Sequence, residues 1–339
     1  MRTISAADAI SPAVQRTREF LFRPFNWGTY LKLGLVAIIT EGSGNNFRSH
    51  DQSSQGHGPM IQSPIDIPPV LIAESIAALL LALVLLMFVF YLITRLRFAF
   101  FNCLIHNTKM IRPGWWLYRE QASRFFWMNV TVGFCFLLLV VLIAIPFIGG
   151  FARLFHETQL GGPFDVKLLL SLLLPLLPII LLLVLAGFLT DLIMRECMLP
   201  HYALDNATAG EAWSQVWARI MAEKRQFIAY ALLRIVLPAI AMIAVFIVLL
   251  LPALALAGSL AAVEFGLHSA FADSTGASAL VGILLEVFFG VLAFGFALLA
   301  TICLGGPIST GVREYALIFY GGRYQALGDI LYPPVLRSA

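Results

Sequence analysis

The sequence has few charged residues. Only 12% of its 339 residues are charged, about half of the roughly 25% typical of soluble domains. Mean hydropathy is +0.88, and the formal net charge of +3 does not suggest a nucleic-acid partner. A soluble globular domain and a nucleic-acid-binding protein are therefore both disfavoured. The composition predicts an integral membrane protein whose main surroundings are membrane lipids.

Motifs for catalysis and for metal binding are also missing. No H-E-x-x-H, G-x-S-x-G or G-x-x-x-x-G-K-[ST] occurs, and His50, Asp51 and His57 have the spacing of no standard metal site. The four cysteines form no C-x-x-C pair and are expected to be small apolar side chains. They are Cys103, Cys135, Cys197 and Cys303. We therefore expect no cofactor, no metal site and no enzymatic activity.

Six apolar segments are predicted to cross the membrane, because about 20 apolar residues span a hydrocarbon core of about 30 Å. These segments are 27–40, 70–93, 127–148, 168–190, 227–251 and 279–304. The first is the shortest and contains Lys32, so a re-entrant or surface element is the alternative to a span there. We expect one all-α polytopic domain over residues 1–339.

The stretch 41–69 differs from the rest of the chain. It is rich in Gly, Ser, Gln, Asn and Pro, and it has too little apolar surface to fold alone. We expect a flexible extracytoplasmic loop.

Lys and Arg concentrate on one side of the predicted membrane. Seventeen of the 22 lie in the segments 1–26, 94–126, 191–226 and 305–339. Three lie on the other side, and these are Arg48, Arg153 and Lys167. Cytoplasmic loops carry an excess of Lys and Arg, so we predict a bacterial inner membrane protein with both termini in the cytoplasm. This alternation is the main argument that 27–40 crosses.

The connector between the fourth and fifth predicted spans, Arg195–Met221, has the clearest pattern. A charged pair at the membrane exit is followed by a polar break and then by an amphipathic helix whose T-x-x-E start has the spacing of a capping box. The residues of this motif are Arg195, Glu196, Asp205, Thr208, Glu211, Trp213 and Trp217. We expect the helix to lie in the membrane interface, and a docking groove for a partner protein is the alternative.

This pattern recurs elsewhere in the chain. The aligned pairs are Arg97 with Arg195, Asn107 with Asp205, and Trp115 with Trp213. A third, shorter copy begins at Arg313. The sequence therefore suggests three repeated helical hairpins, with interfacial helices on the cytoplasmic side.

Ionisable residues inside the predicted spans are the candidates for chemistry, because charges within a membrane are costly and are usually paired or functional. Arg234 lies in the fifth span and Glu286 in the sixth, entered from the opposite face. Their direct pairing requires a tilt, and Asp191 is an equally good partner for Arg234. Structural ion pairing is the first interpretation, and a polar cavity for a substrate or for protons is the second.

Several runs carry a family resemblance. PHYALDNATAGEAWSQVW, FIAYALLRIVLP and GGPISTGVREYALIFYGG, with FRPFNWGTYLKLGLVAIITEG near the start, resemble uncharacterised bacterial multi-pass families of unknown function. Those families are similar to the membrane domain found ahead of some glycerophosphodiester phosphodiesterases. The resemblance implies a bacterial membrane protein and brings no catalytic or ligand residue with it. The clustered His and Glu residues of the phosphodiesterase domain are not present.

Two functions fit these observations. The first is a non-enzymatic scaffold or accessory subunit with an unidentified membrane protein partner. The alternative is a small-solute or lipid transporter that uses Arg234 and Glu286. An intramembrane enzyme is the weakest hypothesis, because the sequence shows no nucleophile with an adjacent base.

Overall fold

The computed structural model describes residues 4–42, 69–159, 166–271 and 277–332. Within these ranges the regular structure is helical and no strand occurs, so the predicted all-α class is confirmed there. An α-helix satisfies its backbone hydrogen bonds within one segment, which is the requirement that a lipid environment imposes on a long apolar run. The expected loop residues 43–68, with His50, Asp51 and His57, lie outside the described residues.

The described residues form eleven α-helices and one π-helix. In chain order they are α1 (Ile10–Phe22), α2 (Trp27–Gly42), α3 (Pro69–Ile105), α4 (Ile111–Leu117), α5 (Arg119–Gln159), α6 (Val166–Leu192), the π-helix η1 (Ile193–Met198), α7 (Leu199–Leu204), α8 (Ala209–Ala222), α9 (Lys224–Phe271), α10 (Ala277–Gly321) and α11 (Gln325–Leu331). Glu41 therefore belongs to the last turn of α2, whereas the sequence pattern assigned it to the loop.

Among the described residues, five helical stretches are long and apolar enough to cross a membrane. They are Glu74–Ile105, Arg119–Leu154, Leu169–Leu204, Lys224–Leu251 and Leu280–Gly321. The sixth expected span, 27–40, corresponds to α2 and is not among them. With 16 residues, α2 extends about 24 Å at about 1.5 Å per residue, which is less than a hydrocarbon core of about 30 Å.

The chain divides into two compact units. The first is built from the described parts of residues 1–85, 99–111 and 225–339, and the second from residues 86–98 and 112–224. α3 contributes to both. Each unit has its own packed core, described in turn below.

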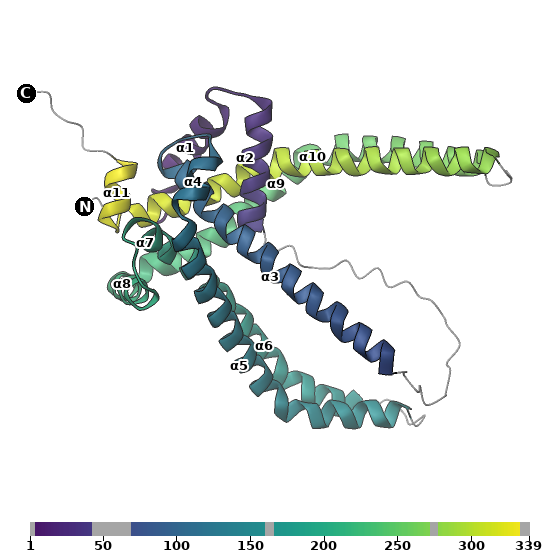
Figure 1. The fold of residues 1–339 in the computed structure, drawn as a ribbon, viewed down its shortest axis with the longest axis horizontal. Coiled ribbons are helices and arrows are strands. Elements are labelled where there is room, and N and C mark those ends of the chain that lie inside the picture. Colours follow the sequence, from purple (N-terminus) through teal and green to yellow (C-terminus); the bar gives the residue numbers. More distant parts are fainter. Residues whose placement is uncertain (1–3, 43–68, 160–165, 272–276, 333–339) are drawn as a thin grey trace, which may run out of the picture. The chain divides into compact units, whose positions relative to one another are not determined.

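In the first unit, α10 packs against α1, α2 and α11 (Figure 1). We call this packed region the hub: α1, α2, α11, the start of α9 and the second half of α10. Phe319 and Tyr320 of α10 are 1% exposed in the hub, whereas Phe288 and Phe294 in the first half of α10 are 60% and 71% exposed. One helix thus carries a protein-facing half and an apolar half that is suited to lipid.

α2 crosses α10 at a pair of glycines. A Cβ on Gly306 would lie 2.7 Å from the Cα of Gly34, so only glycine lets the backbones approach this closely. Pro307 lacks an N–H, which leaves the carbonyl of Cys303 without its helical partner. The hydroxyl of Tyr30 in α2 donates to that carbonyl at 2.6 Å. The Gly-Gly-Pro sequence is therefore the docking point of α2, and α10 continues through it as one helix.

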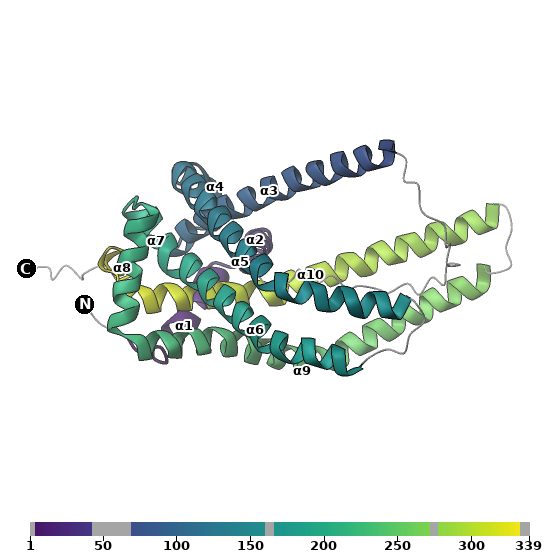
Figure 2. The same cartoon turned by 90° about the horizontal axis from the view of Figure 1, so that it is seen from below.

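In the second unit, α5 packs against α6 (Figures 1 and 2). The ring of Phe125 meets Phe98 at a centroid distance of 5.5 Å and Tyr202 at 5.3 Å, both edge to face. The guanidinium of Arg95 lies 4.4 Å above the Trp115 ring and donates to its carbonyl at 2.7 Å. Aromatic packing holds this core together.

The helices α3 and α7 end in the same way. Asn107 follows α3 and Asn206 follows α7, and both adopt a φ of 52°, the left-handed conformation in which asparagine commonly ends a helix. The alignment of the connectors expected Asn107 to match Asp205. The matching residue is one position later, because the second connector passes through the π-helix η1, and one wide turn holds an extra residue.

Candidate functional site

The main candidate site is a cluster of buried charges in the hub. Glu41, in the last turn of α2, places one carboxylate oxygen 2.8 Å from Nη2 of Arg234 and the other 3.8 Å from Nε of Arg313. The side chains of Glu41, Arg234 and Arg313 are 8%, 16% and 4% exposed. A single carboxylate thus lies between guanidinium groups from α9 and α10, and it joins three helices.

A second ion contact lies one residue further along α10. Nε of Arg16 in α1 is 3.1 Å from Oε2 of Glu314, whose side chain is fully buried. Nη2 of Arg16 also donates to the carbonyls of Leu104 at 2.6 Å and Ile105 at 3.3 Å. The last carbonyls of a helix lack intrahelical partners and carry partial negative charge. Arg16 therefore joins α1 to α10 and to the C-terminal end of α3.

These contacts leave Glu314 with little hydrogen bonding. Neither of its carboxylate oxygens accepts a hydrogen bond from the described residues, so Arg16 balances its charge by proximity. A buried carboxylate without a counter-charge is costly. Arg16 is therefore the residue on which the burial of Glu314 depends.

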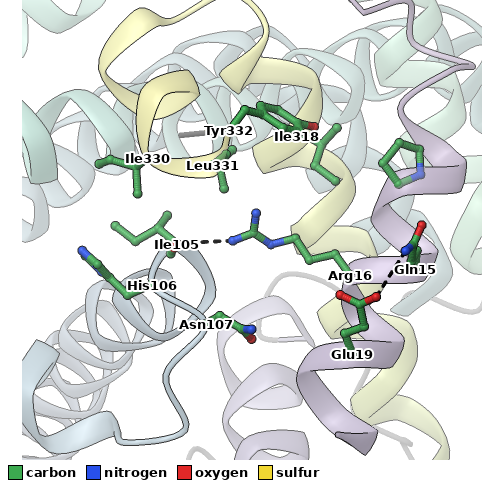
Figure 3. A pocket seen from close by; sticks show the side chains of 11 residues that line it. Gln15, Arg16, Glu19, Ile105, His106, Asn107, Ile318, Ile330, Leu331 and Tyr332 are labelled. Atoms are coloured by element: carbon green, nitrogen blue, oxygen red, sulfur yellow. Dashed lines mark hydrogen bonds between the residues drawn. The ribbon is translucent and has the colours of Figure 1, made fainter. Parts of the chain in front are cut away.

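A cavity of about 360 Å³ lies beside Arg16 (Figure 3). In that view the Arg16 side chain extends across the cavity toward Ile105, while Gln15 donates to Glu19 on the same helix at 3.2 Å. His106 and Asn107 line the opposite wall. The Arg16 guanidinium already donates to the carbonyls of Leu104 and Ile105. This part of the cavity wall therefore has a structural role.

The three intramembrane residues expected from the sequence have different partners. Arg234 pairs with Glu41, a partner that the sequence did not suggest. Glu286 contacts His268 at 3.3 Å, and both side chains are partly exposed, at 37% and 77%. Asp191 pairs with Arg195 one helical turn away at 3.0 Å.

The connector in the second unit contains a capping box. The backbone N–H of Thr208 donates to Glu211 at 2.9 Å, and the N–H of Glu211 lies 3.4 Å from the Thr208 hydroxyl oxygen. The backbone N–H of Thr208 and then its hydroxyl stabilise the charged carboxylate, which lowers the pKa of Glu211. This arrangement begins α8 directly after the turn at Asn206.

α8 presents its tryptophans outward. Ala212 and Val216 are buried, whereas Trp213 and Trp217 are 42% and 45% exposed. The two indole rings stack at a centroid distance of 5.8 Å. α8 thus has one row of residues packed against the protein and one exposed aromatic row. Exposed tryptophans of this kind suit a membrane interface.

His201, which the sequence did not suggest, ties α7 to α8. Its Nε2 lies 3.1 Å from Nη1 of Arg219 and its Nδ1 lies 3.3 Å from Oδ2 of Asp205. Arginine only donates, so Nε2 accepts and Nδ1 carries the proton toward Asp205. Asp205 thus acts as a hydrogen-bond acceptor at the end of α7. The i,i+4 spacing of His201 and Asp205 was the available sequence signal.

Glu196 and Arg195 lie in η1 and are both buried, at 3% and 6% exposure. π-Helical turns occur frequently at functional sites.

The part of the chain that the structure describes holds no group of three or more His, Cys, Asp or Glu residues that could bind a metal ion.

The five long apolar helical stretches of the described residues are those of a multi-pass helical membrane protein. The chain belongs to a family of unknown function (DUF7544), whose model matches residues 4–330. No curated protein and no solved structure is significantly similar to the chain. Nothing in the family match links the chain to glycerophosphodiester phosphodiesterases, so the family of unknown function is the part of the resemblance that is supported.

Proposed function

We propose that this protein is a non-enzymatic scaffold or accessory subunit of a bacterial inner membrane, with a membrane protein as its partner. The observation that carries the proposal is the pairing of buried charges between helices. Glu41 contacts Arg234 and Arg313, and Glu314 contacts Arg16. Charges committed to one another in this way maintain a helix arrangement and are poorly placed to bind or carry a solute.

The same contacts argue against the transporter alternative. A transporter that uses Arg234 and Glu286 needs both groups on one pathway. Arg234 is engaged with Glu41 in the hub, whereas Glu286 contacts His268 in the apolar half of α10, at the other end of that helix from the hub. The ion contacts thus favour a structural role for Arg234.

A double-mutant cycle tests this role. We expect Glu41→Gln and Arg234→Met to lower the free energy of unfolding in detergent, with a coupling energy of about 1–3 kcal/mol between them. Ser214→Ala, in the second unit, is the control. Additive effects, or unchanged stability in both single variants, would remove the observation on which the proposal rests.

The partner itself needs a separate experiment. The full chain is crosslinked in its native membranes, purified through an affinity tag, and compared with a Trp213→Ser/Trp217→Ser variant and with a Trp127→Ser control. We expect the same membrane protein in a constant ratio to the chain in every preparation from the unsubstituted protein. Repeated purification without such a partner contradicts the scaffold proposal.

The proposed orientation has six spans and cytoplasmic termini, and the distribution of Lys and Arg supports it. Single cysteines introduced at Ser5 and Ser54, in a background where Cys135 and Cys303 are replaced by alanine, measure it directly. We expect an impermeant maleimide to label Ser54→Cys in intact spheroplasts and Ser5→Cys only after permeabilisation. Labelling of both positions from one side would show that 27–40 does not cross.

A further inference from the structure

An apolar groove lies where α1 rests against α9 and α10. Its volume is about 320 Å³, and its walls include Val14 of α1, Pro238 of α9 and Ile308 of α10. Two polar groups in the wall are already bonded within the fold. The hydroxyl of Thr17 donates to the carbonyl of Ala13 at 2.7 Å, and that of Tyr315 donates to the carbonyl of Ala6 at 3.0 Å. The groove thus presents mainly hydrocarbon.

The groove continues along the seam between α9 and α10. A second apolar hollow of about 500 Å³ begins at Met242 and Gly305, next in sequence to the first hollow's Ala241 and close to its Pro307. Both views show α9 and α10 running alongside each other away from the hub (Figures 1 and 2). From residue 300 to residue 312 of α10 the seam is about 18 Å long at about 1.5 Å per residue, slightly more than half of a hydrocarbon core of about 30 Å.

The surface around this seam is apolar and exposed. Met242, Phe246 and Leu254 of α9 line the second hollow and are between 56% and 64% exposed. In a membrane these side chains meet lipid tails, and the hollows open onto the same surface. Water does not favour an apolar hollow, so the surrounding component with matching chemistry is an acyl chain.

The hub end of the groove carries a positive charge. Arg18 of α1 lines it and is exposed, and no ion pair joins Arg18 to the described part of the chain. A guanidinium can form two parallel hydrogen bonds to a phosphate. We propose that this groove binds one acyl chain of an anionic phospholipid, with the phosphate of its headgroup at Arg18. This site is separate from the charge cluster of Glu41 and does not depend on the scaffold function.

Photocrosslinking tests the proposal on the full chain. The protein is reconstituted in phosphatidylcholine vesicles that contain a minor fraction of phosphatidylglycerol with a diazirine at the end of one acyl chain, and the labelled peptides are mapped by mass spectrometry. We expect labelling to concentrate on peptides that contain Ala241, Leu249 or Leu304. Ala241→Trp fills the groove and should abolish this enrichment, whereas Ala239→Trp, on the exposed face of the same helix, should leave it unchanged.

The headgroup is tested by competition. Arg18→Gln should lower the preference of these peptides for labelled phosphatidylglycerol over phosphatidylcholine by about fivefold, as expected for one arginine beside an anionic headgroup, and Arg23→Gln should not. If Ala241→Trp prevents folding, as judged by gel filtration, Ala241→Leu and Ala239→Leu replace the pair. Even labelling of all lipid-exposed helices, or equal effects of the two substitutions, would overturn the site. Enrichment in the groove without an Arg18 effect would overturn the headgroup assignment.

Discussion

The same dipeptide, arginine followed by glutamate, occurs in each compact unit and has different kinds of partner. In the first unit, Glu314 contacts Arg16 from the beginning of the chain, and Arg313 contacts Glu41. In the second unit, Arg195 contacts Asp191, four residues earlier in the same helix. The first arrangement connects helices that are distant in sequence, whereas the contact between Arg195 and Asp191 lies within one helical stretch.

The same dipeptide can therefore contribute different amounts to the free energy of unfolding in the two units. Glu314 is fully buried, so the loss of its counter-charge leaves a carboxylate that water cannot reach. Asp191 directly follows the predicted span 168–190 and is 49% exposed, so water at the membrane surface screens its attraction to Arg195. We therefore expect substitutions of partner residues to affect the first unit more strongly than the second.

The largest effect is expected for Arg16→Ala. It removes the counter-charge of Glu314 and the cap on the last carbonyls of α3, and breaking a buried pair in this way costs about 3–5 kcal/mol. Denaturant unfolding of the purified protein, followed by tryptophan fluorescence, measures the change. Arg18→Ala, on the exposed side of the same helix, serves as the control.

The neutral replacement Glu314→Gln refines this prediction. In the Arg16→Ala background it should recover part of the lost stability, because no charge then remains buried. If Arg16→Ala and Arg18→Ala lower stability equally, the contact between Arg16 and Glu314 does not stabilise the first unit.

The next largest effect concerns the crossing of α2 over α10. Gly306→Val introduces a side chain where a Cβ would already lie 2.7 Å from the Cα of Gly34, and we expect a loss of about 1–3 kcal/mol from overpacking. Gly295→Ala in the same helix has no atom within 4 Å of the new Cβ. It should be neutral or slightly stabilising, by up to about 1 kcal/mol. Equal losses for the two variants would show that α2 does not dock at this point.

In the second unit, Thr208→Ala should have a moderate effect. It removes the hydroxyl of the capping box, which typically costs about 1 kcal/mol. Because the folded state lowers the pKa of Glu211, the carboxylate half of the box stabilises α8 above the ordinary carboxyl pKa. That contribution is lost as the pH falls through the lowered value. Circular dichroism between neutral and acidic pH should therefore show Thr208→Ala closest to the unsubstituted protein at the lowest pH, and a constant difference would contradict this role.

The smallest effect is expected for Asp191→Ala. An exposed i,i+4 pair contributes about 0.3–0.5 kcal/mol and is screened by salt. The unfolding midpoint should move slightly at low ionic strength and not measurably at high ionic strength. A loss of stability as large as that of Arg16→Ala would show that the ion contacts of the two units contribute equally.

Much of the architecture was predictable from local patterns. The helical class and most of the long apolar helices follow from uninterrupted apolar runs, and the capping box follows from the spacing of Thr208 and Glu211. Helix ends were harder to place. α5 runs through Pro146 and α10 through Pro307, because in a helix bundle neighbouring groups satisfy the carbonyls that a proline leaves free.

The candidate site was only partly predictable. Arg234 stood out because a charge within an apolar run is costly, but its partner did not. Glu41 was assigned to a loop, since glycine and serine follow it directly, and no sequence pattern marked Arg16 as the partner of Glu314. No sequence pattern relates residues 41 and 234, because their contact arises only after α2 docks on α10.

The sequence by itself determined that this chain forms long apolar helices, where charges interrupt them and how α8 begins, because these properties depend on neighbours within a few residues. Only the tertiary structure decided that Gly34 meets Gly306, that Tyr30 occupies the carbonyl freed by Pro307, and that Arg16 balances Glu314. Those contacts join residues hundreds of positions apart. Their partners are selected by the geometry of helix packing, which local composition does not encode.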